Sequence, residues 1–546
     1  MELPTNLPRK FWPLLAILFA LFIALGAAGW WRTLQEATGH AEPGLVIEKV
    51  VDMVAGEEAI VVNEKYDEHW MLLVGKWGIK AVLGAALFRS ILVLFRRRIR
   101  VWRFRRVRGH RVFAGLGGQN ADLALREARQ GLVVAALVED EHHPRQGELE
   151  EAGVLVLNGS PGDPQRLGAA GIARASRIVV AAAAGDAESI AVAEAIAATG
   201  TDEEGQTREL LVCLDSRQTR EFLNQRWNLI VRPERGWTTK LVGFEAAALR
   251  HLVTGMAREL ADLAASPPPA PRLLVVADLE FTREFLRAAI PFLQISGESL
   301  PEYRVVIEDA EEAGAFALLH PAAPLVADVR FVTVPERLAP ICEALSGLEF
   351  DVAIVKQPSE SRTLHLAEAL LRSPRFRVRR VEAIVTHAVK TGLGDDPDLR
   401  VSSLFELGLN SAEFGELTLE DEARANHEAY LAGLPPAERA KGGEWRDLPE
   451  NFKESNRWAV LHRRIKRAIW ERTPEEGRQA MLEHLSICEH QRWTGEKAMD
   501  GWRHAELPSQ DKKRRLHPSI IPWGDLSESE KEKDRVQVRK ALGLVE

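Results

Sequence analysis

The chain has 546 residues, more than one compact core accommodates, so several domains are expected. Its composition, 46% hydrophobic and 27% charged, is that of folded globular protein. The formal net charge of −8 argues against a dedicated nucleic-acid binder. Three widely separated cysteines exclude a disulfide framework or a cysteine-rich zinc site and suit a reducing compartment.

Two apolar stretches lie near the N-terminus. The first, Phe11 to Trp31, has about the 20 residues that cross a hydrocarbon core as a helix. The second, Trp70 to Phe95, is also long enough to span, although it carries Lys76, Lys80 and Arg89. A cleaved signal peptide is the alternative for the first stretch, but the following WWRTLQ has no small-residue cleavage pattern. We therefore expect two membrane spans.

The charges beside the two stretches predict the topology. The segment RRRIRVWRFRRVRGHR, residues 96 to 111, is strongly basic, whereas the connection 32 to 69 is acidic. By the positive-inside rule, residues 1 to 108 form a hairpin in the plasma (inner) membrane of a bacterial-type cell, with both termini and the main body cytoplasmic. Contact of the arginines with anionic membrane lipid or with nucleic acid is the alternative role.

A β-α-β order follows the arginines. A strand predicted over 111 to 114 runs into the loop GLGGQN, then a helix over 121 to 130, then an apolar run that ends at Glu139. Glycines permit close backbone approach to a phosphate at a helix N-terminus, and an acid after the second strand can bind a ribose hydroxyl. The sequence predicts a doubly wound α/β domain over 109 to 265 whose cofactor-binding residues are Gly115, Gly117, Gly118, Asn120 and Glu139.

The segments HRVFAGLGGQN, LVVAALVEDE and NGSPGDPQRLGAAGIARASRIVVAA resemble the N-terminal half of RCK domains, which regulate potassium conductance and also occur in Trk-type (TrkA-N) regulators of potassium transport. The resemblance covers about residues 109 to 255. It implies that NAD(H), ATP, ADP or a similar nucleotide binds near the glycines and Glu139, and that a dimer or ring of domains couples the ligand to a membrane element. Ser160 departs from the family, which usually has an aspartate there, and a scaffold without a ligand is the alternative.

The pattern restarts after the proline-rich segment SPPPAP, residues 266 to 271. Strand-like and helix-like stretches alternate over 271 to 391 and predict a second, degenerate Rossmann-like domain. Its first loop reads Ala277-Asp278-Leu279-Glu280, whose carboxylates would repel a phosphate. We therefore expect this domain to pair subunits or to transmit strain.

Residues 392 to 443 are rich in charge and turn residues and are treated as a connector. Residues 444 to 546 resemble the RyR domain, a small helical module repeated in ryanodine receptors and present singly in prokaryotic proteins. The residues that carry this resemblance are Asn456, Arg457, Glu489, His490, Arg492, Trp493, Glu496, Lys497, Gly501, Trp502, His517, Pro518, Pro522, Trp523, Lys533, Asp534 and Arg535.

The RyR-like segment suggests a ligand face. Glu489, Trp493 and Lys497 recur at i, i+4 spacing, so one helix face presents an acid, an aromatic ring and a cation. Such a face can stack a base or hold a charged small ligand, whereas the alternative is a tryptophan core. The candidate ligand residues are Glu489, Arg492, Trp493, Lys497, Trp502, His517 and Trp523. No metal site is expected, because His484, Cys488 and His490 have no evident fourth ligand.

The order of domains predicts a membrane-anchored, ligand-sensing regulator of ion transport, with potassium as the expected ion. A nucleotide or other small ligand on the RCK-like and RyR-like domains would act on the hairpin of a homo-oligomer, or on a separate transporter subunit. A classical potassium channel is not expected, because T-V-G-Y-G is absent between the spans. No catalytic residues are predicted. The alternatives are a nucleotide-signal sensor and membrane effector in a defence or stress system, and an NAD-dependent oxidoreductase.

Overall fold

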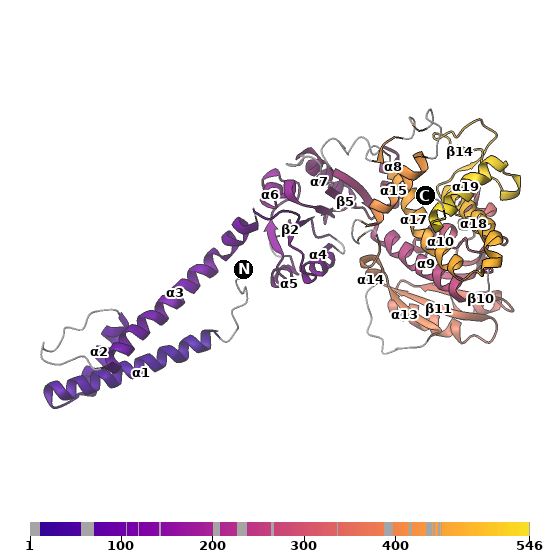
Figure 1. Cartoon of the computed structure of the whole chain (residues 1–546). Coiled ribbons are helices and arrows are strands. Elements are labelled where there is room, and N and C mark those ends of the chain that lie inside the picture. The colour runs from indigo at the N-terminus through magenta and orange to yellow at the C-terminus, as the bar shows by residue number, and fades with distance from the viewer. Residues whose placement is uncertain are drawn as a thin grey trace. The chain divides into compact units, whose positions relative to one another are not determined.

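The computed structural model consists of two compact units, Met1–Arg106 and Val107–Glu546 (Figure 1). It describes residues 11–55, 70–104, 106–117, 120–140, 143–199, 208–226, 237–263, 267–335, 337–386, 397–412, 414, 418–432, 439, 443–445, 448 and 450–544.

The first unit is helical and consists of α1 (Phe11–Thr38), α2 (Pro43–Ala55) and α3 (Trp70–Phe104). Glycines allow α1 and α3 to pack backbone to backbone: a Cβ on Gly29 would lie 2.5 Å from the amide nitrogen of Leu72, and one on Gly75 would lie 2.6 Å from Cα of Gly26. Small residues at such a contact are typical of paired membrane helices. Two segments, Pro13–Thr38 and Trp70–Phe88, are long and apolar enough to cross a membrane. The expected pair of apolar N-terminal helices is confirmed.

The second unit begins with a six-stranded parallel sheet in the order β3-β2-β1-β4-β5-β6, which we call the first Rossmann domain. Its central strands contain short, buried apolar runs, such as the fully buried VAALV of β2, as expected where helices cover both faces of a parallel sheet. Its elements are β1 (Arg111–Ala114), α4 (Asn120–Arg129), β2 (Val134–Val138), α5 (Gln146–Glu151), β3 (Leu155–Asn158), α6 (Pro164–Ala169), η1 (Ile172–Arg174), β4 (Arg177–Val180), α7 (Asp186–Thr199), β5 (Arg208–Cys213), α8 (Arg217–Arg226), β6 (Trp237–Val242) and α9 (Phe244–Leu263). The strand order reverses between β1 and β4, which places a ligand crevice at the carboxyl ends of these strands.

A second six-stranded parallel sheet, in the order β12-β11-β10-β7-β8-β9, repeats the same winding when it is traced from β9. We call it the second Rossmann domain. Its elements are β7 (Arg272–Ala277), α10 (Leu279–Phe292), β8 (Glu302–Ile307), α11 (Glu311–Leu319), η4 (Ala323–Leu325), β9 (Asp328–Thr333), α12 (Leu338–Ala344), β10 (Glu349–Lys356), α13 (Glu360–Leu371), β11 (Arg377–Val385) and β12 (Leu399–Ser403).

The rest of the chain is mainly helical and packs on α9 and α10. It comprises α14 (Leu404–Leu409), α15 (Thr418–Ala432), α17 (Glu450–Glu471), η6 (Glu475–Gly477), α18 (Arg478–Met499), β13 (Arg503–His504), β14 (Leu516–His517), η7 (Trp523–Asp525) and α19 (Glu528–Leu542). One apolar cluster includes Val253 of α9, Ile290 of α10, Leu461 of α17 and Leu485 of α18. The C-terminal helices therefore share a hydrophobic core with the second Rossmann domain.

The expected fold class, two apolar helices followed by two Rossmann-like sheets and a small helical domain, is confirmed. The C-terminal part departs from an all-α domain in one detail, because the two-residue strands β13 and β14 pair with each other. β12, α14 and α15 lie within residues 392 to 443, the segment treated above as a connector.

Candidate ligand-binding sites

The glycine loop after β1 lies against the end of β4. Gly115 has φ +90°, its amide donates to the carbonyl of Leu137, and a Cβ there would collide with the carbonyl oxygen of Ala181. The amide of Gly117 donates to that same carbonyl at 3.0 Å, and a Cβ on Gly117 would lie 2.6 Å from the carbonyl oxygen of Ala182. Side chains are therefore excluded at both positions, because the loop backbone packs directly against the end of β4.

Asn120 stabilises this loop from the start of α4. The side chain is 4% exposed, and its amide nitrogen donates to the carbonyl of Gly115 at 3.2 Å. Its backbone amide donates to the carbonyl of Gly117. Asn120 therefore occupies the position of the third glycine of the motif, and its hydrogen bond to Gly115 stabilises the loop. Gly118, the remaining predicted loop residue, lies outside the described residues.

A cavity of about 80 Å³ opens beside the loop at the carboxyl ends of β1, β4 and β5. Its lining includes Gly117, Asn120, Asp215, Phe244 and Phe414. Sites for drug-sized ligands usually exceed about 300 Å³, so a dinucleotide needs the crevice to open further.

Phe414 narrows this crevice from a distant part of the sequence. Its ring lies 5.3 Å from that of Phe244, and its carbonyl accepts a hydrogen bond from Arg177 at 3.1 Å. The preceding α14 is attached as well, because Arg126 donates to the carbonyl of Leu409. Analysis of the sequence did not find Phe414, because its position in the crevice depends on a contact between segments far apart in the chain.

Glu139 follows the last residue of β2, where the predicted ribose-binding acid is expected. A hydrogen bond with the carboxyl of Glu188, in α7, raises the pKa of Glu139 to about 7, and partial burial adds to this effect. At this position the carboxyl of Glu139 can also bind a ribose hydroxyl. Glu188 was missed because nothing in its local sequence distinguishes it from other acids of an exposed helix face.

The corresponding loop of the second Rossmann domain is occupied by its own side chains. Asp278 caps α10 by accepting from the amide of Phe281 at 2.9 Å. The ammonium of Lys356, at the end of β10, lies 2.6 Å from the second oxygen of the same carboxylate. A carboxylate thus stands where a nucleotide phosphate binds in a Rossmann domain, with its own counter-ion.

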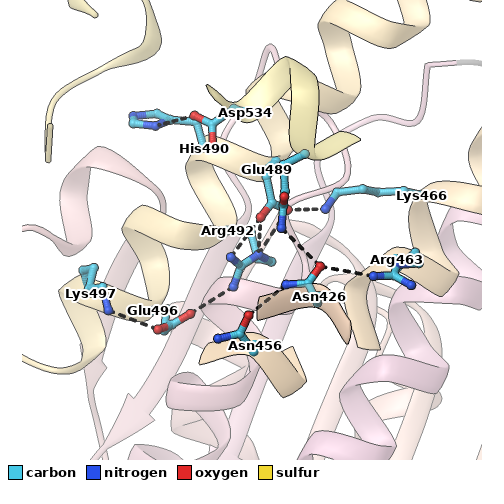
Figure 2. A network of polar contacts seen from close by, with 11 residues as sticks. Asn426, Asn456, Arg463, Lys466, Glu489, His490, Arg492, Glu496, Lys497 and Asp534 are labelled. Carbon is cyan, nitrogen blue, oxygen red and sulfur yellow. Dashed lines mark hydrogen bonds and ion pairs between the residues drawn. The ribbon is translucent and has the colours of Figure 1, made fainter. Parts of the chain in front are cut away.

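The predicted ligand residues of the RyR-like segment separate into two groups. Glu489 and Arg492 belong to the interior, where they are 4% and 3% exposed. Figure 2 shows the network around them: Lys466 and Arg492 donate to Glu489, and Arg492 also donates to Glu496 at 3.0 Å. Burial raises the pKa of Glu489, but the charges of Arg492 and Lys466 outweigh burial and hold that pKa well below its usual value. These two side chains are therefore satisfied within the protein.

The second group forms a half-buried aromatic cluster. The rings of Trp493 and His517 are 4.9 Å apart and edge-on, and those of Trp502 and His517 are 6.3 Å apart. The ammonium of Lys497 lies 5.7 Å from the centre of the Trp502 ring and pairs with Glu496. Burial, followed by the charge of Lys497, lowers the pKa of His517 to about 4, so this imidazole is neutral at pH 7.

Trp523 is connected to this cluster through His490, whose ring centre lies 5.8 Å from that of Trp523 and 6.0 Å from that of Trp493. The imidazole of His490 bonds to the carbonyl of Ile521 at 2.8 Å and faces Asp534 at 3.4 Å (Figure 2). Within the described part of the chain, no group of three His, Cys, Asp or Glu side chains is arranged to hold a metal.

A chain of buried ion pairs connects the first Rossmann domain to the C-terminal helices. Glu209 of β5 forms ion pairs with Arg177 at 2.6 Å and with Lys240 at 2.8 Å. Lys240 also lies 3.2 Å from Glu420 of α15, which accepts from Arg457 of α17 at 2.8 Å. Burial raises the pKa of Glu420, but the charges of Arg457 and Lys240 lower it to about 2. These ion pairs could not be predicted from the sequence, because their members come from separate elements.

Comparisons with known proteins identify the C-terminal domain. The family model of the RyR domain matches residues 474–546. No curated protein matches the chain.

Among solved structures, the chain is similar to the GsuK channel bound to NAD, with 14% identity and a TM-score of 0.37, over 78% of this chain and 87% of that one. It is also similar to GsuK bound to ADP, with 15% identity and a TM-score of 0.35 over 73% and 96%. For the GsuK RCK domain the values are 12% and 0.35 over 61% and 82%. The fold assignment rests on the strand order of the two sheets, and the expected RyR domain is confirmed within residues 444 to 546: the chain carries an RyR domain at its C-terminus.

Proposed function

We propose that the chain is a membrane-anchored, ligand-sensing regulator of ion transport, with potassium as the ion, and that it is not an enzyme. NAD(H) or another adenine nucleotide is the proposed ligand of the first Rossmann domain. The observation that carries the proposal is the Gly115–Gly117 loop, which packs tightly on the end of β4 and borders the crevice at the point where the strand order reverses. The same chain carries two helices of membrane length.

The surface of the helical unit supports the membrane part of the proposal. Ile17 and Leu21 of α1 and Trp77 and Phe88 of α3 are 65%, 52%, 65% and 64% exposed, respectively. Apolar side chains with this much exposed surface are stable in contact with lipid and are costly to expose to water. The proposed arrangement is two spans in the plasma membrane with the Rossmann and RyR domains in the cytoplasm, in line with the basic segment 96 to 111.

A nucleotide regulates such a protein only if it binds two conformations with different affinity. The crevice beside Phe414 offers a physical basis for this difference, because a bound nucleotide competes for space with the Phe414 residue, whose backbone carbonyl is held by Arg177. The proposed assembly is a homo-oligomer that acts through its own hairpins or on a transporter subunit. The RyR domain supplies a second binding surface.

The crevice chemistry favours binding over catalysis. Cys213 lines the cavity, but burial raises the pKa of its thiol to about 12, so the thiol stays protonated and is a poor nucleophile.

Nucleotide binding by the detergent-solubilised full chain tests the proposal. Calorimetric titration with NAD, NADH, ADP and ATP is expected to show saturable binding of at least one. Gly117→Asp is expected to weaken it at least about a hundredfold, because the added side chain collides with the carbonyl of Ala182 and shifts the loop, and its negative charge repels a phosphate. Gly147→Asp is the matched control, because its Cβ has nothing within 4 Å. Equal affinity in the two variants, with unchanged melting temperatures, would place the ligand elsewhere.

A further inference from the structure

A larger cavity, of about 290 Å³, lies between the second Rossmann domain and the RyR domain. One wall comes from the loop after α10 and from η4, and the other from α18 and the segment before and within η7. Its lining includes Leu300, Leu325, Ile487, Gln491, Thr494 and Trp523.

The two walls are fixed to each other by hydrogen bonds. The imidazole of His484 bonds to the carbonyl of Ile295 at 3.0 Å, and the side-chain amide of Gln491 donates to the carbonyl of Gly297 at 3.2 Å. Gly297 has φ +68°, and a Cβ there would lie 3.0 Å from Nδ1 of His484. The separation of the walls is therefore set by close contacts, so the cavity is a built feature of the interface.

The lining is mainly apolar and includes none of the Lys, Arg, Asp or Glu side chains that the structure describes. One polar atom stands out: the side-chain oxygen of Gln491 is buried and has no hydrogen-bond partner. A buried acceptor without a partner costs free energy, so a ligand that brings an N–H donor is favoured at this point. The ring of Trp523 adds an aromatic surface against which a flat ligand can pack.

The volume of the cavity limits the size of the ligand. A cavity of about 150 Å³ holds a benzene ring, and sites for drug-sized ligands begin near about 300 Å³. The present volume of about 290 Å³ suits a heterocycle of one or two rings with a small substituent.

The charges beside Trp523 favour a neutral ligand. Lys531 and Arg535 lie 5.9 and 5.7 Å from the centre of its ring, but Lys531 pairs with Glu528 at 3.2 Å and Arg535 pairs with Glu483 at 2.7 Å. Their positive charge is therefore already compensated near the cavity.

We propose that this cavity binds a nucleobase carried by an uncharged nucleoside, with Gln491 accepting a hydrogen bond from a ring or exocyclic N–H and Trp523 packing against the base. The inference rests on the proposed function, because it makes this interface a second ligand input of the same regulator. A ligand here contacts both domains and stabilises their present arrangement.

Titration of the full chain with adenosine, guanosine and AMP tests the inference. Adenosine or guanosine is expected to bind saturably, with AMP at least about tenfold weaker because the described lining contains no cation for its phosphate. Gln491→Leu is expected to weaken nucleoside binding about tenfold through the lost hydrogen bond. Leu300→Trp, which fills the cavity, is expected to abolish binding, whereas the control Leu348→Trp, at a side chain 36% exposed outside the lining, leaves it unchanged.

Absence of saturable nucleoside binding to the wild-type chain would overturn the inference, as would equal affinity in both cavity variants and the control. AMP binding tighter than either nucleoside would overturn the preference for a neutral ligand. Gly117→Asp separates the two sites. If a nucleoside still binds to Gly117→Asp, the nucleoside site is the cavity, even if the wild-type chain binds no dinucleotide. If Gly117→Asp loses nucleoside binding and the cavity variants keep it, the nucleoside site is in the first Rossmann domain.

Discussion

At the scale of single residues, the pairing of Glu139 with Glu188 has a consequence for pH. Because the folded chain holds a proton on Glu139 up to a pKa of about 7, against an ordinary value of 4.5, it binds more protons than the unfolded chain between these values. Stability from this pair is therefore present at low pH and is lost as the pH rises from about 4.5 to about 7.

Glu188→Gln removes the second acid and is expected to bring the pKa of Glu139 back toward its ordinary value. The melting temperature of the variant should fall less than that of the wild type between about pH 5 and about pH 8. Scanning fluorimetry across this range checks the prediction, with Glu151→Gln, an exposed acid of the same domain, as the control. Parallel pH profiles for the wild type and Glu188→Gln would show that the pair does not share a proton.

The sequence identified the residues whose roles depend on local backbone. Gly115 and Gly117 are recognisable because the turn between a strand and a helix excludes a side chain at both positions. Glu139 is recognisable because it directly follows a strand. The roles of Glu489 and Arg492 could not be predicted in this way. Their i, i+3 spacing is visible in the sequence, but their burial depends on Lys466 of another helix. In the sequence, an interior ion network therefore looks the same as a ligand-binding face.

At the scale of elements, strands with continuous apolar runs were predictable, because burial on both faces requires them. β6, β11 and β12 were not, since their sequences, WTTKLV, RVRRVEAIV and LRVSS, mix charged or polar residues into the strand. Neighbours compensate these groups. Glu382 of β11, for example, accepts a hydrogen bond from Ser402 of β12.

The segment around α14 gives a test at this scale, because it holds Phe414 in the crevice of the first Rossmann domain. Phe414→Ala is expected to destabilise the fold by about 3–5 kcal/mol through the lost buried ring. The same change is expected to raise nucleotide affinity about fivefold, since the crevice no longer has to open against the ring.

Denaturant unfolding and calorimetric titration of the same preparations measure both effects. Phe405→Ala is the matched control, because Phe405 also stacks on Phe244, at 6.2 Å, but does not line the crevice. Weaker nucleotide binding in Phe414→Ala than in Phe405→Ala would mean that Phe414 forms part of the ligand site.

At the scale of the whole molecule, the second unit offers continuous physical contact from the first Rossmann domain to the RyR domain. The ion pairs from Arg177 through Lys240 and Glu420 reach Arg457 of α17, the helix that also carries Lys466 of the network in Figure 2. Separating one buried ion pair leaves a charge without a partner, which is costly. The connected ion pairs therefore resist partial rearrangement and favour concerted motion of the two domains. Contiguity is a basis for coupling between ligand sites, whereas coupling itself requires measurement.

The central claim is that a nucleotide on the first Rossmann domain changes the membrane hairpin. Electron paramagnetic resonance measures such a change directly, as the distance between two spin labels. The labels are attached at Leu21→Cys on α1 and Leu83→Cys on α3, which are both exposed positions. The full chain is reconstituted in lipid nanodiscs, and its native cysteines are replaced. A saturating nucleotide from the binding titration is expected to shift the distance distribution in the wild-type background and to leave it unchanged in Gly117→Asp. Identical distributions with and without a nucleotide that demonstrably binds would contradict the account.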